Sequence, residues 1–357
     1  MRGARSTRFN LPVEPPIEPM LALLAREFPP EGDWTYEFKY DGFRAIVFWD
    51  GDRLFLQSRD SKPLNRYFPE LEAGLREVLP AKAVLDGEIV IETPHGFDFD
   101  ALLLRIHPAA SRVAKLAKET PASFIAFDLL ATGRTSLMKH PFRERRMKLV
   151  AMLKSPRLPL RLTPATSDQA LARKWFRELE GAGIDGVMAK DPASPYAPGE
   201  RVMIKIKHER TADCVVGGFR WSKDHAGKAV GSLLLGLYEG KVLHYVGHAS
   251  NFRAPERMSL VTLLEPYRKN LKGTFGEGRA PGGPSRWSRD MDKSWEPVRP
   301  ELVCEVAYDH MQGDRFRHAG RFMRWRPDKP PRDCTYTQLR EARPMNPRVL
   351  FRQRIPR

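Results

Sequence analysis

The segment 37–44 reads Glu37-Phe38-Lys39-Tyr40-Asp41-Gly42-Phe43-Arg44 and places charged residues where the apolar alternation predicts a β-strand. A lysine held in a partly apolar pocket has a lowered amine pKa, which makes it a usable nucleophile. Asp41 and Gly42 are suited to a tight turn, and Arg44 is suited to holding ribose or phosphate. The alternative is a solvated strand end with alternating charges, so further segments have to decide between the two.

Three further segments place charged residues within apolar strands. The segment 85–90, Leu-Asp-Gly-Glu-Ile-Val, buries a carboxylate at Glu88, which is costly unless the group is paired or binds a metal ion. The alternative is a structural glutamate that backbone donors satisfy. The segment 184–190 repeats the order of acid, glycine, apolar residues and base. The segment 203–207 puts two lysines on one face of a strand, which indicates a bound polyphosphate or, alternatively, an edge strand with solvated lysines.

Length, charge and cysteine usage limit the class of protein. The chain has 357 residues and a formal net charge of +16, which indicates two or three domains and a polyanionic partner. No apolar run reaches the roughly 18 residues of a membrane span, and the basic N-terminus lacks the apolar region of a secretory signal. Cys214, Cys304 and Cys334 have neither disulfide nor metal spacing, which indicates a reducing cytosol.

The composition changes near residue 208. Residues 1–207 carry 32 basic and 27 acidic residues, a net of +5, whereas residues 208–357 carry 28 and 17, a net of +11. The first part mixes strands and helices and indicates an α+β domain, while the second has short strands around one helix, as in a small OB-type barrel. We therefore expect four parts: an extended proline-rich segment 1–20, a first domain 21–208, a second domain 209–345 and a basic tail 346–357.

The periodicity also predicts the individual elements. The predicted helices are 69–79, 99–104, 111–118, 142–153, 168–181 and 255–264. The predicted strands lie in 34–58, with a turn at 50–52, and at 83–91, 124–130, 186–190, 202–207, 214–221, 232–238, 242–246 and 302–308. The loop 269–297 contains Trp287 and Trp295, which either lie against nucleic-acid sugars or anchor the loop onto the barrel.

Taken together, these segments resemble the nucleotidyltransferase superfamily of ATP-dependent DNA ligases and capping enzymes. The matching motifs follow the order of the family at 39–44, 58–60, 86–88, 127–130, 185–190, 205–207 and 326–329. The stretches 120–130, 180–190, 205–216 and 231–238 resemble the bacterial ligase C type, which has only the two catalytic domains. The resemblance implies a nucleotidyltransferase (ATP-grasp-like adenylation) domain followed by an OB-fold β-barrel domain.

The resemblance also implies a reaction. Lys39 would attack the α-phosphorus of ATP, release pyrophosphate and carry a covalent lysyl-AMP. The AMP would pass to the 5′-phosphate of a nick in duplex DNA, and the 3′-hydroxyl would then displace AMP and seal the strand. The catalytic residues that the resemblance implies are Lys39, Asp41, Arg44, Lys205 and Lys207.

Binding roles follow residue by residue from the same resemblance. Glu37 would recognise the adenine amino group, and Phe127 would stack on adenine, although an ordinary core phenylalanine is the alternative. Glu88 would contact ribose or bind Mg²⁺, with Mn²⁺ as a substitute. Asp185 would be the second carboxylate for the metal, and it stands where most of the superfamily has glutamate. Arg326 would orient pyrophosphate in the first step only, after the OB domain pivots near residues 208–211. The implied nucleotide-binding residues are Glu37, Lys39, Arg44, Arg59, Glu88, Phe127, Lys190, Arg201, Lys205, Lys207 and Arg326.

The expected partners are nicked duplex DNA and ATP, with a primase-polymerase or end-joining repair proteins and without a membrane. We expect a monomer in the bacterial cytoplasm, at the nucleoid, that acts in DNA repair. The alternatives are an RNA ligase or a GTP-using capping enzyme, and a non-catalytic OB-fold protein that only binds DNA.

Overall fold

The computed structural model describes residues 8–223, 225–268, 274–276, 281, 294–339 and 343–351. The chain folds as two compact units, Met1–His208 together with Ala342–Arg357, and Glu209–Glu341. No helix in the described part of the chain is long and apolar enough to cross a membrane.

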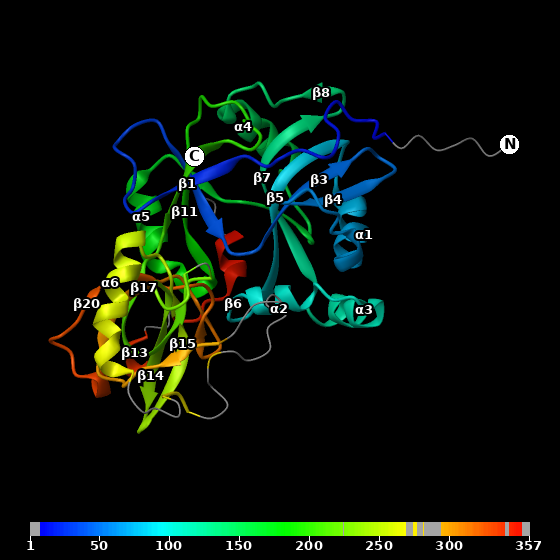
Figure 1. Ribbon diagram of the computed structural model, residues 1–357. Coiled ribbons are helices and arrows are strands. Elements are labelled where there is room, and N and C mark those ends of the chain that lie inside the picture. Colours follow the sequence, from blue (N-terminus) through cyan, green and yellow to red (C-terminus); the bar gives the residue numbers. More distant parts are fainter. Residues whose placement is uncertain are drawn as a thin grey trace. The chain divides into compact units, whose positions relative to one another are not determined.

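The larger sheet of the first unit has the strand order β4-β3-β5-β7-β8, with β6 beside β5 and β9 beside β7 (Figure 1). Its strands are nearly continuous buried runs, because helices α1 (Pro69–Val78), α2 (Phe99–Leu104) and α4 (Phe142–Met152) pack against them. The strands are β3 (Phe43–Trp49), β4 (Leu54–Ser58), β5 (Ala83–Thr93), β6 (Gly96–Phe97), β7 (Ala122–Thr132), β8 (Thr135–Ser136) and β9 (Leu160–Leu162).

The smaller sheet of this unit has the order β1-β12-β11-β2-β10. Helix α5 packs on β11 and β2, where Ala172 and Val187 are completely buried. The strands are β1 (Leu21–Ala25), β2 (Thr35–Tyr40), β10 (Ala165–Thr166), β11 (Ile184–Lys190) and β12 (Arg201–Lys207).

The helices of the first unit begin at local signals in the sequence. Pro69 occupies the first turn of α1, and the carboxylate of Asp168 accepts hydrogen bonds from Ala170 N and Leu171 N at the start of α5. The α-helices are α1 (Pro69–Val78), α2 (Phe99–Leu104), α3 (Ala110–Glu119), α4 (Phe142–Met152) and α5 (Gln169–Glu178). The short 3₁₀ helices are η1 (Asn65–Tyr67), η2 (Glu180–Ala182) and η6 (Pro347–Phe351).

The second unit is a curled sheet of order β15-β14-β13-β17-β20, with β16 beside β13. Gly320 N donates to His248 O at 2.8 Å just before β20, which joins the end of β15 to the other edge of the sheet. The strands are β13 (Arg210–Trp221), β14 (Val230–Glu239), β15 (Val242–Ala249), β16 (Glu296–Pro297), β17 (Val303–Tyr308), β18 (Met311–Gln312), β19 (Arg315–Phe316) and β20 (Arg321–Trp325). The helices are α6 (Ala254–Leu264), η3 (Glu265–Tyr267), η4 (Pro331–Asp333) and η5 (Tyr336–Gln338).

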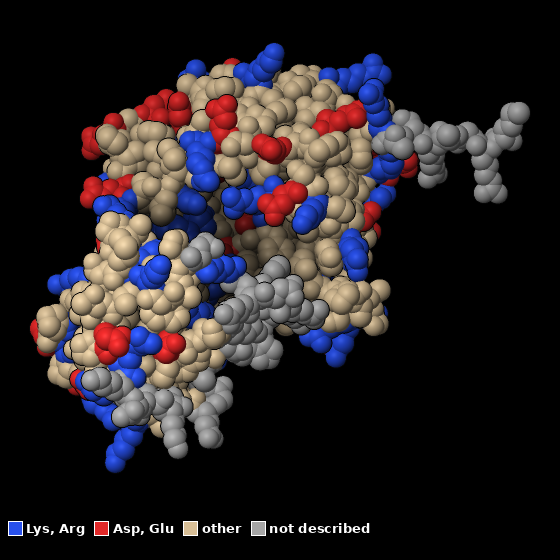
Figure 2. Space-filling model, in the orientation of Figure 1, with Lys and Arg blue, Asp and Glu red and all other residues tan. Residues whose placement is uncertain are grey.

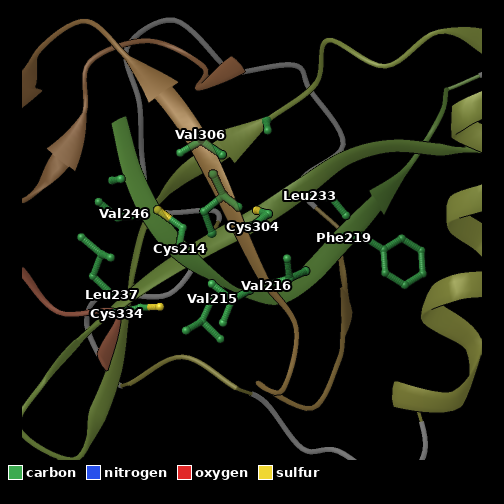
Figure 3. Packing of buried hydrophobic residues seen from close by; sticks show 14 of the residues in the cluster. Cys214, Val215, Val216, Phe219, Leu233, Leu237, Val246, Cys304, Val306 and Cys334 are labelled. Atoms are coloured by element: carbon green, nitrogen blue, oxygen red, sulfur yellow. The ribbon is translucent and has the colours of Figure 1, made fainter. Parts of the chain in front are cut away.

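All three cysteines lie in the core of this barrel. Cys214 and Cys304 are cross-strand partners on β13 and β17, and Cys334 packs against the same cluster (Figure 3). Burial raises the pKa of each thiol, that of Cys334 to about 12, so these groups behave as small apolar side chains. The cysteines are free thiols. The barrel and the mixed first unit confirm the predicted α+β fold class.

Trp295 packs onto the barrel rather than standing free. A Cβ on Gly218 would lie 2.5 Å from the Trp295 ring, and one on Gly217 would lie 2.5 Å from Phe275. The two aromatic rings are 5.5 Å apart between centroids. Trp295 therefore follows the anchoring alternative, whereas Trp287 lies outside the described residues.

The segments at the two chain ends also belong to the first unit. Val13, Ile17 and Met20 are buried in it, although we expected 1–20 only as an extended segment. Of the predicted tail 346–357, Leu350 is buried in a cluster with Phe38, and residues 352–357 lie outside the described part. Lysine and arginine side chains alternate with acidic ones over the visible face of this unit (Figure 2).

Candidate active site

Three neighbouring strands bring the predicted charged residues to one face. Strand β11 pairs antiparallel with β2 on one side and with β12 on the other. Because side chains alternate along a strand, residues two apart share a face. The paired rows across β2, β11 and β12 are Lys39–Gly186–Lys207 and Glu37–Met188–Lys205.

These rows form part of a pocket of about 290 Å³ in the first unit. Every predicted nucleotide-binding residue of this unit lines the pocket, together with the segment 19–22, Met188 and Met203, which we had not predicted. The predicted residues that line it are Glu37, Lys39, Arg44, Arg59, Glu88, Phe127, Lys190, Arg201, Lys205 and Lys207.

Asp185 joins the two lysines at the end of this face. Its Oδ2 accepts from Lys39 Nζ and forms an ion pair with Lys207 Nζ at 2.9 Å, and the Asp185 side chain is 3% exposed. The register of β11 against β2 shifts at this point, so that Asp185 lies beside the paired row. Gly186 has a φ of 149°, and a Cβ there would lie 2.0 Å from Ile206 O, which explains the glycine.

Glu37 lies deeper in the pocket between two cations. Its Oε2 is 2.7 Å from Lys190 Nζ and its Oε1 is 3.5 Å from Arg146 Nη1. Glu37 is 2% exposed, and Oε1 has no hydrogen-bond partner. A buried carboxylate oxygen of this kind can accept a hydrogen bond from a ligand that donates one.

The guanidinium of Arg44 is fixed by Asp86. Arg44 Nε and Nη2 donate to the two carboxylate oxygens of Asp86 at 2.5 and 2.6 Å, and Tyr196 Oη donates to Asp86 Oδ2 at 2.6 Å. Arg44 lies 4.6 Å from the centroid of the Phe127 ring, and Lys190 Nζ lies 4.7 Å from it. The aromatic ring is thus surrounded by positive charge, which cation–π attraction stabilises.

Phe127 reaches the pocket because β7 bulges there. Ala126 pairs with Gly87 and Asp128 pairs with Asp86, so Phe127 is the extra residue of the bulge. The residues on both sides of Phe127 are buried, whereas Phe127 is only partly buried and lines the pocket. This geometry disagrees with the alternative of an ordinary core phenylalanine.

Electrostatics of the pocket favour an anionic ligand. Burial lowers the pKa of Lys205 from its usual range, and the nearby cations of Lys39 and Lys207 lower it further. Burial raises the pKa of Glu88 to about 7, against the opposing effect of Arg44. The Glu88 Oε1 accepts from Gly42 N at 3.1 Å. An anion would relieve the repulsion among the lysines, and a metal ion would stabilise the ionised form of Glu88.

Three predicted site residues lie outside the pocket lining. Asp41 lies between β2 and β3, where its charge raises the pKa of Glu88. Arg326 belongs to the second unit, where Nη1 pairs with Asp213 at 2.8 Å and Nη2 with Asp328 at 2.8 Å. Lys329 N donates to Arg326 O at 3.1 Å, a turn that places Pro327 at its favoured second position. Asp185, the third, contacts the pocket lysines as described above.

The donor set fits a cation that phosphates help to hold. The described residues contain no group of three or more His, Cys, Asp or Glu side chains that could hold a metal ion. Mg²⁺ is commonly held by one or two carboxylates together with substrate phosphates and water. Glu88 matches that arrangement, whereas Asp185 uses Oδ2 to hold two ammonium groups.

Sequence patterns gave no signal that Arg146, Asp86 and Tyr196 hold side chains of the pocket in place from behind its lining. Arg146 occupies an ordinary position on α4, and Tyr196 lies in a proline-containing loop. Asp86 was visible only as a neighbour of Glu88. Their positions depend on contacts between residues far apart in the chain.

The first unit has a lysine-lined pocket on a β-sheet, and the second unit is an OB-type barrel. This combination is that of a covalent nucleotidyltransferase. Residues 19–207 match the model of the ATP dependent DNA ligase domain, and residues 226–329 match that of the ATP dependent DNA ligase C terminal region. The chain belongs to the ATP-dependent DNA ligase family, and as a DNA ligase it uses ATP.

The similarity to curated relatives extends along nearly the whole chain. DNA ligase C1 of Mycolicibacterium smegmatis is 50% identical, over 92% of this chain and 95% of the relative. DNA ligase C of Mycobacterium tuberculosis is 51% identical, over 92% and 95%. A solved Lig E DNA ligase structure shares the fold, with a TM-score of 0.54 and 18% identity over 86% of this chain and 99% of that chain. The two ligase C relatives confirm the resemblance to the ligase C type.

Proposed function

We propose that this ligase seals nicks between a 3′-hydroxyl and a 5′-phosphate in duplex DNA through a lysyl-AMP formed on Lys39. The observation that supports the proposal is the position of Lys39 in the pocket. It lies in one row with Lys207, and Arg44, Arg59 and Lys205 line the same pocket. A nucleophile among several cations suits attack on a polyphosphate, because phosphoryl transfer depends mainly on positioning and charge neutralisation.

In the first step, the Lys39 ammonium gives a proton to Asp185, which its Nζ contacts. The neutral Nζ then forms a bond to the α-phosphorus of ATP, and the bond to pyrophosphate breaks. Lys205 and Lys207 hold the α-phosphate and offset the charge that develops in the transition state. Asp185 keeps Lys39 and Lys207 side by side, since both ammonium groups contact its Oδ2. Arg44, Arg59 and Asp41 complete the motif around ribose and phosphate.

Base recognition uses the deeper part of the pocket. Glu37 Oε1, buried and without a hydrogen-bond partner, accepts the exocyclic amino group of adenine. Phe127 stacks on the base, beside Lys190. Guanine presents a carbonyl oxygen at that position, which would repel the carboxylate, and the pocket therefore selects ATP over GTP.

Glu88 would hold Mg²⁺ together with the phosphates, and Mn²⁺ can replace it. Asp185, whose Oδ2 holds Lys39 and Lys207, would be the second carboxylate through a bridging water. When bound, the cation supplies further neutralisation of phosphate charge. Arg201 lines the mouth of the pocket on β12 and contributes to holding phosphate.

In the second step AMP passes from Lys39 to the 5′-phosphate of the nick, and in the third the 3′-hydroxyl displaces AMP. We propose that Arg326 orients pyrophosphate in the first step alone, and that the second unit grips duplex phosphates during the later ones. The enzyme would act as a monomer in the bacterial cytoplasm, at the nucleoid, in DNA repair. A primase-polymerase or end-joining proteins would be its partners.

Intact-mass measurement tests the proposal directly. The protein is incubated with Mg²⁺ and either ATP or GTP, and the Lys39→Ala variant serves as the control. We expect a mass increase of one AMP with ATP only, absent from the variant. An adduct formed from GTP alone, an unmodified wild-type protein, or an adduct on Lys39→Ala would overturn the proposal.

Nicked substrates with DNA or RNA at the junction extend the test, and faster sealing of RNA nicks would contradict the assignment of DNA as substrate.

A further inference from the structure

The hydroxyl of Tyr196 joins parts of the pocket wall that lie far apart in the sequence. Tyr196 is 4% exposed, and its Oη donates to Asp86 Oδ2 at 2.6 Å and accepts from Met20 N at 3.1 Å. Asp86 is completely buried and holds Nε and Nη2 of Arg44 at 2.5 and 2.6 Å. Arg44 Nη2 also donates to Met20 O at 3.3 Å. These four residues therefore form one closed network behind the pocket.

The network determines where the Arg44 guanidinium can lie. Asp86 engages two of its nitrogens in a fork, the geometry in which arginine and carboxylate bind most specifically. Met20 and Arg44 both line the pocket, whereas neither Tyr196 nor Asp86 does. A change at the Tyr196 hydroxyl thus reaches the nucleotide only through other side chains.

Loss of the hydroxyl would remove a hydrogen bond from two groups. Asp86 Oδ2 would keep Arg44 as its single described side-chain donor, and the Met20 N–H would lose its acceptor. A buried charged or polar group that loses a hydrogen bond has a strong tendency to move toward another one. The carboxylate of Asp86 would then rotate, and the guanidinium of Arg44 would move with it.

We propose that Tyr196 is a positioning residue for the adenylation step: its hydroxyl, through Asp86, fixes Arg44 and, through Met20, the adjoining wall of the nucleotide pocket. The inference rests on the proposed function, in which Arg44 contacts the ribose or phosphate of ATP. The competing view is that Tyr196 only stabilises the loop that contains it, because Arg145 also lies 5.8 Å from its ring and holds Ser194 O at 3.0 Å.

The test compares Tyr196→Phe with the native enzyme in the formation of lysyl-AMP from labelled ATP. Tyr336→Phe is the matched control, because it removes one hydroxyl that donates to Asp314 O at 3.2 Å in the second unit. We expect the KM for ATP of Tyr196→Phe to rise about tenfold, the size of one hydrogen bond to a charged group, with kcat changed less than about threefold. The control should keep the native KM.

A double-mutant cycle separates positioning from a purely structural role. In an Arg44→Gln background, Tyr196→Phe should weaken labelled ATP binding, measured by equilibrium dialysis, much less than it does in the native background, because the route through Arg44 is gone and only the Met20 contact remains. Tyr196→Phe with a KM within twofold of native, or an equal loss of ATP affinity in both backgrounds, would overturn the inference. If the melting curve shows that Tyr196→Phe does not fold, Asp86→Asn replaces it with the same expected outcomes.

The two hypotheses fail in different ways. If native protein forms no lysyl-AMP, the proposed function is wrong. If native protein forms it normally and Tyr196→Phe behaves as the control does, the proposed function stands and the positioning role is wrong.

Discussion

Gly186 is the middle residue of the paired row Lys39–Gly186–Lys207, and its backbone conformation sets the spacing of this row. It pairs with Lys39 on one side and Lys207 on the other, next to Asp185, which contacts both. Its φ of 149° and its approach to Ile206 leave no room for a side chain. The relative positions of Lys39 and Lys207 therefore depend on the absence of a Cβ at Gly186.

We predict that Gly186→Ala destabilises the protein by more than about 3 kcal/mol, through a strained backbone and a clash that separates β11 from β12. Lysyl-AMP formation should be lost with it. Gly133→Ala is the control, because Gly133 also has a positive φ of 56° but a Cβ there meets nothing within 4 Å, so it should cost only about 1 kcal/mol. Urea unfolding of both variants measures the difference. Equal stabilities would contradict this account.

For single residues, the sequence predicts membership of the site where a charged residue stands among apolar neighbours. Lys39, Glu88 and Lys205 stand out because charge within an apolar strand requires a partner, and all three line the pocket. Tyr196 and Arg146 cause no such conflict, since a tyrosine in a loop and an arginine on a helix are ordinary. Their roles follow only from contacts to Asp86 and Glu37, respectively, which lie more than 100 positions away in the sequence.

At the scale of single elements, the bulge in β7 converts a core strand into part of a binding site. Asp128, immediately after Phe127, is 1% exposed and receives Nε and Nη2 of Arg145 at 2.8 and 2.9 Å. Arg145 Nη1 donates in addition to His140 O and Ser194 O. One buried arginine thus fixes the bulge and the loop that leads to Tyr196.

We predict that Asp128→Asn lowers the free energy of unfolding by about 3–5 kcal/mol, because it leaves the buried Arg145 without its countercharge. It should also weaken ATP binding, since Phe127 loses its fixed position. Arg76→Met is the control: the side chains of Arg76 and Glu72 on α1 are 40% and 26% exposed, and pairs near the surface contribute at most about 1 kcal/mol. Chemical denaturation and ATP titration measure both effects. A change below about 1 kcal/mol in Asp128→Asn would show that the ion pair is not required.

The structure agrees with the predicted elements where the prediction depends on the periodicity of neighbouring residues. The helix at 142–153 and the strand at 124–130 were predicted from periodicity, and the structure has them as α4 and β7. Strand β1 was missed, because Leu21–Ala25 does not alternate and pairs in parallel with β12, some 180 residues later. That pairing also excludes the edge-strand alternative for Lys205 and Lys207, since β12 has β1 on one side and β11 on the other.

At the scale of the whole molecule, the charge surplus has two different uses. In the first unit the lysines and arginines of the pocket are specific and close together, while the surface of that unit mixes both signs (Figure 2). Of the surplus of +11 past residue 207, residues 209–341 of the second unit carry +6, and residues 342–357, which belong to the first unit, carry +5. Arg286, Arg289 and Lys293, which contribute to it, lie outside the described residues.

We predict that binding to nicked DNA weakens steeply with salt. With about six phosphate contacts, the affinity should fall about a thousandfold between about 50 and 200 mM salt, because each contact releases counterions. Fluorescence anisotropy with Lys39→Ala measures binding without ligation. ATP binding to the same protein provides the comparison, since it should depend less on salt. A flat DNA affinity over that range would exclude phosphate contacts as the main source of binding.

A substitution of Arg326 tests whether the second unit acts differently in adenylation and in sealing. If it orients pyrophosphate only, Arg326→Ala should slow lysyl-AMP formation about a hundredfold, the typical effect of one lost charge-stabilising donor, and leave sealing of a pre-adenylated nick within about threefold. Arg324→Ala is the matched control on the same segment, because Arg324 is 65% exposed and pairs with Glu305 rather than with Asp213. That control should retain both rates. The comparison needs similar melting temperatures for the two variants, since Arg326→Ala also breaks the pair with Asp213. An equal loss of both activities in Arg326→Ala would mean that the residue acts in every step, and the second unit would then not need to change its position between adenylation and sealing.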